Sequence, residues 1–127
     1  MSGVTDMRNL FFGKREFNYD ISRWDVSKVT STGCMFHGAQ SFNQAVGDWD
    51  VSGVTNMSSM FNNAQLFNQA VGDWDVSKVT DMEHMFCRSR CFNQDISRWD
   101  MRSVRSTREM FHDAPAMQTV NKPASLR

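Results

Sequence analysis

The chain has 127 residues, enough for one domain with a modest hydrophobic core. Its 14 basic and 14 acidic residues cancel, so the charge gives no indication of a nucleic-acid partner or an anionic membrane. No apolar run approaches the roughly 20 residues of a membrane span, and the start of the chain lacks the order of a signal peptide. We therefore expect no membrane span, and either a fragment of a longer protein or a mature segment.

The composition indicates an unusual core. Ten methionines and ten phenylalanines stand against three leucines, which predicts a core built from Met and Phe at fixed positions. The three cysteines are too few for a disulfide-rich scaffold, and free thiols are the simplest expectation. A disulfide between Cys87 and Cys91 in an oxidising compartment is the alternative.

A 25-residue period runs through most of the chain. The stretch FNQAVGDWDVS occurs unchanged at 42–52 and 67–77, and the tryptophans mark the period at Trp24, Trp49, Trp74 and Trp99. About four and a half copies can be recognised in the sequence. A Trp-Asp propeller is excluded because each of its blades needs about 40–45 residues.

The first half of each copy predicts a short helix. In VTNMSSMFNNA, residues 54–64, the two methionines, the phenylalanine and the alanine fit an i, i+3, i+4, i+7 pattern that begins at Met57. Thr55 occupies the expected N-cap position. Thr80 is followed by Glu83 three residues later, as in a capping box.

The second half of each copy, such as 67–77, alternates apolar residues and contains turn formers, which predicts a short strand and a bend. A unit this small cannot bury its apolar face alone, but stacked units can. We therefore predict an α/β solenoid of about 4.5–5 repeats, each a short helix plus a short strand. The predicted domain is 1–116 and residues 117–127 are a C-terminal cap or tail, with coils near 4–28, 29–53, 54–78, 79–103 and a partial coil at 104–116.

The frame V-T-x-M-x-x-M-F-x-x-A-x-x-F-N-Q-x-[VI]-x-x-W-D-V-S, which covers roughly residues 4–114, resembles a known family. It is similar to the BspA-like leucine-rich-repeat surface proteins, whose repeats are of the Mycoplasma-lipoprotein type. The resemblance implies a right-handed, leucine-rich-repeat-like coil. It also implies a place at the cell surface, a role in adhesion and no catalytic residues.

Residues at the same position of successive copies form columns. The tryptophans are expected to pack in the core, with an exposed aromatic strip for a glycan or partner as the alternative. The asparagine column predicts a ladder that bonds coil to coil, rather than a site for a polar ligand. Its members are Asn18, Asn43, Asn68 and Asn93.

Charged columns have two interpretations. The aspartates of D-V-S predict Asx-turns. A calcium strip is the less favoured alternative, because calcium needs six to eight convergent oxygens. The neighbouring column predicts ion pairs between coils, worth at most about 1 kcal/mol each. That column is Arg23, Asp48, Asp73 and Arg98.

Metal binding and catalysis have weak support in the sequence. His84, Cys87 and Cys91 lie close together, and His37 and His112 share the column of Cys87, but a zinc site needs four convergent ligands. The chain has no G-x-S-x-G, no P-loop and no carboxylate spaced to orient a histidine. We therefore expect no cofactor, no metal and no enzymatic activity.

The last copy departs from the frame, and this is where we expect function. Arg105 replaces the capping threonine, a loss that would cost the predicted helix roughly 1 kcal/mol. With its basic neighbours it forms a candidate surface for an acidic partner, the alternative being a solvated charged face. The candidate partner-binding residues are Arg88, Arg90, Arg98, Arg102, Arg105 and Arg108.

The predicted function is a non-enzymatic protein-interaction module, in cell-surface adhesion by the family resemblance. The alternative is a structural or scaffold subunit within a larger multi-protein assembly, in an organelle or the cytoplasm. The missing signal peptide and the unpaired cysteines favour that alternative. No nucleic-acid partner is expected, and the sequence does not fix the compartment.

Overall fold

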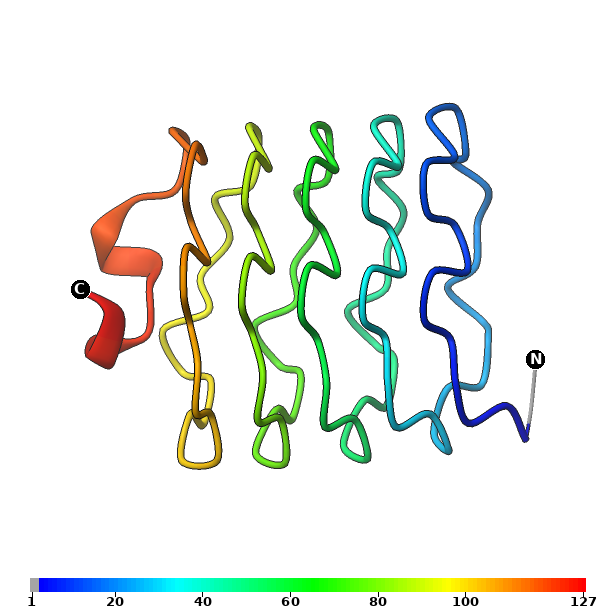
Figure 1. Ribbon diagram of the computed structural model, residues 1–127, viewed down its shortest axis with the longest axis horizontal. Helices are drawn as coiled ribbons and strands as arrows, with labels where there is room; N and C mark the ends of the chain where they lie inside the picture. The colour runs from blue at the N-terminus through cyan, green and yellow to red at the C-terminus, as the bar shows by residue number, and fades with distance from the viewer. Residues whose placement is uncertain (1–2) are drawn as a thin grey trace.

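The computed structural model describes residues 3–127, which form a stack of five coils with the two chain ends at opposite ends of the stack (Figure 1). In each coil the chain crosses the stack, turns at one edge, returns, and turns again at the other edge. Parallel β-bridges join the same position of successive coils. These bridges pair Asp6 with Ser31, Ser31 with Asn56, Asn56 with Asp81, and Asp81 with Ser106.

The predicted α/β solenoid with a helix and a strand in each repeat is wrong. Between residues 3 and 127 the structure has no α-helix and no strand. Its only helices are two 3-10 turns, η1 (Thr119–Asn121) and η2 (Ala124–Leu126), and its β pairing is limited to the isolated bridges. The leucine-rich-repeat architecture expected from the resemblance is overturned by the same finding.

Alternate hydrogen bonding explains why residues 54–64 are not helical. The N–H groups of Ser59 and Phe61 donate to carbonyls of the next coil, at 2.8 and 2.9 Å. Those of Met60 and Asn62 donate three residues back, as in consecutive tight turns. Ser59 also has a φ of 54°, which an L-residue in a right-handed helix cannot adopt. The apolar spacing therefore marks the buried side of a run of turns.

The second half of each coil forms no strand because side chains take over the bonding between coils. The N–H of Asn68 donates to the side-chain Oδ1 of Asn43 at 2.9 Å, where a strand would use a backbone carbonyl. The indole of Trp74 reaches the carbonyl of Val46 at 3.0 Å. Neighbouring coils are therefore held together on this side without a continuous backbone ladder.

The core is built from stacked aromatic rings and methionines, as the composition predicts. Phe36, Phe61 and Phe86 form one column, with ring centroids 5.5 and 5.6 Å apart and nearly parallel planes. A second phenylalanine column lies beside it, and Phe61 is 4.0 Å from Phe67 in the same coil. These rings are fully buried. Burying an aromatic side chain of this size stabilises a fold by several kcal/mol.

The C-terminal residues lie on the outer side of the last coil (Figure 1). The carbonyl of Asn121 accepts from the N–H of Ile96 at 3.0 Å, and the Asn121 side chain donates to Asn93 at 3.0 Å. Pro123 is buried and Leu126 packs partly against the core. The segment that contains η1 and η2 is therefore fastened to the fourth coil.

Candidate interaction surfaces

The tryptophan column is part of the core, as predicted, and is not an exposed aromatic strip. Trp49, Trp74 and Trp99 are 4–5 % exposed, and each indole N–H donates to a carbonyl of the preceding coil at 2.9–3.1 Å. Trp24 is only half-buried because no coil precedes it among the described residues. These side chains carry packing between coils.

The predicted asparagine ladder is confirmed. The Oδ1 atoms of Asn18, Asn43 and Asn68 each accept the backbone N–H of the asparagine in the next coil at 2.9 Å. A glutamine reinforces each rung, as Gln69 does by donating to the carbonyl of Asn43 at 3.1 Å. The amides are therefore used within the fold.

The predicted Asx-turns of the D-V-S aspartates are also confirmed. Asp25 and Asp50 each accept the backbone N–H of the serine two residues on at 3.0 Å, and its hydroxyl at 2.6 Å. These hydrogen bonds, led by the one from the hydroxyl, hold the pKa of both carboxyls below the usual range. In residues 3–127 no group of three or more His, Cys, Asp or Glu side chains is arranged to hold a metal ion.

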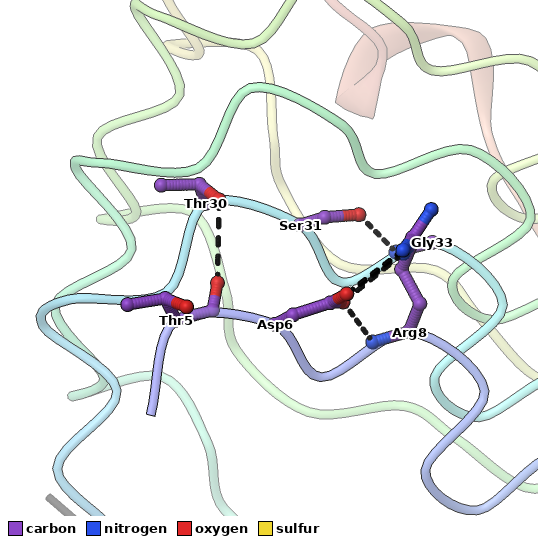
Figure 2. Close-up of polar contacts among 6 residues, drawn as sticks. All are labelled: Thr5, Asp6, Arg8, Thr30, Ser31 and Gly33. Atoms are coloured by element: carbon purple, nitrogen blue, oxygen red, sulfur yellow. Dashed lines mark hydrogen bonds and ion pairs between the residues drawn. The ribbon is translucent and has the colours of Figure 1, made fainter. Parts of the chain in front are cut away.

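The threonine column has a different role from the predicted helix caps. Figure 2 shows the hydroxyl of Thr30 donating to the carbonyl of Thr5 at 3.2 Å, and the same bond recurs from Thr55 to Thr30 and from Thr80 to Thr55. Each threonine thus joins its coil to the one before. At Arg105 the backbone bond to Thr80 remains at 2.8 Å, and the hydroxyl bond is lost.

The predicted ion pairs in the column of Arg23, Asp48, Asp73 and Arg98 are wrong. The four ion pairs found in residues 3–127 lie elsewhere. Arg8, for example, pairs with Asp6 at 2.9 Å within one turn (Figure 2). Two of the four join side chains two residues apart, Arg8 with Asp6 and Arg102 with Asp100, and one joins neighbouring coils.

The cysteines and histidines do not converge on one site. Cys34, Cys87 and Cys91 are free thiols, and only Cys87 is buried. His84 Nε2 lies 2.9 Å from Glu109 Oε2, a pairing that the sequence analysis missed. The two residues are 25 positions apart, so comparing charges along each column would have found it. In residues 3–127 no serine hydroxyl or cysteine thiol forms a hydrogen bond with the side chain of His84 or Glu109.

The six candidate arginines are all exposed, but they are spread around the last two coils. Arg88 and Arg90 belong to the turns of 88–91 at one edge of the stack, and Arg102 to the turn at 102–103 at the opposite edge (Figure 1). Arg102 pairs with Asp100. Among the described residues no ion pair involves the other five, which are Arg88, Arg90, Arg98, Arg105 and Arg108.

A second surface, which the sequence analysis did not single out, is the end of the first coil. Leu10, Phe12 and Tyr19 are 38, 51 and 76 % exposed, although their neighbours Phe11 and Phe17 pack partly against the core. A shallow hollow at this end is lined by Leu10, Phe11, Phe17 and Tyr19 together with Lys14 and Arg15. Exposed apolar side chains beside such a hollow are typical of contact surfaces.

Comparison with known families identifies the repeated frame. A family model described as "Mycoplasma protein of unknown function, DUF285" matches residues 1–86 and 44–124, and the two overlapping matches cover nearly the whole chain. The chain belongs to this family. No curated protein and no solved structure matches this DUF285 member. Neither of its two 3-10 helices, the only helices in residues 3–127, is long or apolar enough to span a membrane.

Proposed function

We propose that this DUF285 protein is a non-enzymatic interaction module that binds another protein at a cell surface, as its resemblance to BspA-like surface proteins implies. The observation that carries the proposal is that some columns form hydrogen bonds within the fold while others are exposed to solvent. The tryptophan, asparagine, aspartate and threonine positions are used in bonds between or within coils. Exposed positions that differ between coils remain free to contact a partner.

Arg105 and Arg108 are the best-placed contact residues. Both are exposed, both lie in the first half of the last coil, and neither forms an ion pair within residues 3–127. A guanidinium group without an internal partner can donate to carboxylates of an acidic partner in a bidentate way. We expect Arg102 to contribute less to partner binding, because its guanidinium group already forms an ion pair with Asp100.

Charge reversal tests the proposal. The variant Arg105→Glu with Arg108→Glu is compared with the unchanged chain for binding to an oligoglutamate peptide by fluorescence anisotropy, and for proteins co-purified from the source cells. We expect both kinds of binding to fall at least about tenfold, because attraction at the contact becomes repulsion.

The matched control is Arg23→Glu with Lys28→Glu, two exposed cations of the first coil, which changes the net charge by the same amount. This variant should retain binding. If the test variant keeps its partner proteins, or the control loses them equally, the arginines of the last coil are not the contact surface.

A structural subunit of a larger assembly is the second candidate, favoured by the exposed Leu10, Phe12 and Tyr19 at the end of the first coil. An apolar surface of this kind is typical of a contact buried in a permanent assembly. Gel filtration in high salt of the material purified from source cells distinguishes the two functions, because salt screens the charge contact of an interaction module and releases its partner, whereas the apolar contact of a permanent assembly persists.

A further inference from the structure

The four alternating backbone hydrogen bonds in the first half of each coil run in one direction. The N–H groups of Met7, Asn9, Phe11 and Gly13 donate to carbonyls of the second coil at 2.7–3.1 Å, at residues 31, 33, 35 and 37. The same set of bonds joins each later pair of coils. Through these four positions every coil therefore accepts on its N-terminal side and donates on its C-terminal side, whereas the bond from Thr30 to Thr5 and its repeats run the other way. The two ends of the stack must differ as a result.

The end of the first coil presents a row of acceptors. Among the described residues no N–H donates to the four carbonyls that correspond to the accepting positions of the second coil, those of Asp6, Arg8, Leu10 and Phe12. The side chain of Leu10 is 38 % exposed, and that of Phe12 is 51 % exposed with its ring centroid 4.7 Å from that of His37 in the second coil. A contacting chain could donate hydrogen bonds to these four carbonyls from the N–H groups of every second residue.

The last coil presents the complementary row of donors. The N–H groups of Thr107, Glu109, Phe111 and Asp113 have no acceptor within residues 3–127. The ring of Phe111 is covered by Lys122, whose ammonium lies 5.0 Å from the ring centroid. A cation therefore sits where the phenylalanine column would otherwise continue.

The two rows match in register. Residues 107, 109, 111 and 113 occupy the same coil positions as 7, 9, 11 and 13, which donate to the second coil. Two copies meeting through their first coils would place the two rows of carbonyls against each other, so neither row would gain hydrogen bonds. Only contact of a first coil with a last coil pairs donors with acceptors.

We propose that the end of the first coil binds the last coil of a second copy of this chain, head to tail. Phe11 of one copy then stacks on Phe111 of the other, as Phe86 does on Phe111 at 5.8 Å. Residues 119–127 restrain this contact because Lys122 must first leave the ring. A head-to-tail contact does not close on itself, so a terminal segment that limits it prevents continuous growth.

This inference uses different surfaces from the proposed function and is tested on the full chain. Pro123→Asp with Leu126→Asp removes the apolar anchors of the C-terminal segment and leaves the coils unchanged. In sedimentation velocity this loosened chain should show a mass that rises with concentration to at least about twice that of the monomer, the minimum for two copies. A loosened chain that folds and stays monomeric at all concentrations overturns the proposal.

Blocking the acceptor end should reverse the effect. Phe12→Glu in the loosened chain should restore the monomer, whereas Leu66→Glu should not. Both side chains are about half exposed, at 51 and 52 %, but Leu66 lies on the third coil. Equal association of the two variants shows that the end of the first coil is not involved, and overturns the proposal.

Photo-crosslinking decides the matter even if the loosened chain fails to fold. Benzoylphenylalanine replaces Phe12 in the otherwise unchanged chain, and light- and heavy-isotope copies are mixed at high concentration before irradiation. We expect mixed-isotope cross-links between position 12 and residues 107–113. Cross-links from position 12 to any other segment of a second copy overturn the proposal.

Discussion

At the scale of single residues, the fold depends on two backbone positions in each coil with a positive φ. The second position holds Gly13 and Gly38 in the first two coils, at φ of 71° and 74°. In the third and fourth coils the same position holds Asn63 and Arg88, at 58° and 59°. Glycine adopts this conformation freely, whereas other L-residues are strained in it. The later coils therefore hold strain that the first two avoid.

Replacing the strained residue should stabilise the protein. Arg88→Gly removes a left-handed penalty of roughly 1–2 kcal/mol and adds about 0.5–1 kcal/mol of unfolded-state entropy. The free energy of unfolding should therefore rise by up to about 1 kcal/mol in urea denaturation. Arg90→Gly is the control, because this exposed arginine has no positive φ, and it should lower stability. If Arg88→Gly and Arg90→Gly change the free energy of unfolding equally, Arg88 is not strained by its positive φ.

A second residue-scale prediction concerns Gly47, which lies close against the backbone of the next coil. A Cβ added there would lie 2.1 Å from the carbonyl oxygen of Ala70, part of the backbone of the next coil. Gly47→Ala should destabilise the chain by about 1–3 kcal/mol, the usual cost of overpacking. At Gly53 the nearest atom would be 3.5 Å away, so Gly53→Ala should cost little or stabilise slightly. Thermal melts of the two variants separate them.

At the scale of elements, each coil has two halves that join its neighbours by different chemistry. The first half uses backbone N–H groups, and the second uses asparagine side chains. Apolar spacing in the first half marks the buried residues correctly but does not distinguish a helix from a run of turns. Met57, Met60, Phe61 and Ala64 are all fully buried. The secondary structure depends on which carbonyl each backbone N–H donates to, and the apolar spacing does not indicate that carbonyl.

The asparagine ladder makes a prediction at this scale. Asn68→Ala removes the oxygen that accepts from the N–H of Asn93 and from Gln94, and should cost about 1–2 kcal/mol. Hydrogen exchange of the Asn93 amide should accelerate at the same time. Asn68→Asp keeps the acceptor and should restore most of the protection. If alanine and aspartate behave alike, the oxygen is not the bonding group.

At the scale of the whole molecule, stability accumulates from contacts between neighbouring coils. The period and the core residues could be predicted from the sequence because the same residue types recur at the same position of each repeat. The helix and the strand were predicted wrongly, since each depends on where the backbone N–H groups donate. The ion pair of Arg23 with Asp48 was also predicted wrongly, since sharing a column does not by itself bring exposed side chains of two coils together. The open end at Leu10 and Phe12 was missed because exposure at an end of the stack leaves no periodic signal.

Acid should weaken the whole stack through its Asx-turns. The pKa of Asp50 and Asp75 is held down in the folded state, mainly by hydrogen bonds from Ser52 and Ser77. Their contribution is complete above the unfolded value of about 4 and is lost as the pH falls through the lower folded value. Asp50→Asn with Asp75→Asn should therefore flatten the fall in unfolding free energy below pH 4.

The control for this pH dependence is Asp48→Asn with Asp73→Asn. These aspartates are neighbours in sequence of the first pair, and in residues 3–127 they accept no hydrogen bond. Urea denaturation at a series of pH values measures both variants. If the control flattens the dependence as much as the test variant, the hydrogen bonds of the Asx-turns are not the cause.

The central claim is that each coil donates alternate N–H groups to the next coil and forms no helix. Scalar couplings across hydrogen bonds, measured by NMR in the labelled protein, identify each donor and acceptor directly. The structure predicts a coupling from the N–H of Phe61 to the carbonyl of Met85, bonded at 2.9 Å. A coupling from Phe61 to the carbonyl of Met57, four residues earlier, would show a helix and contradict the account.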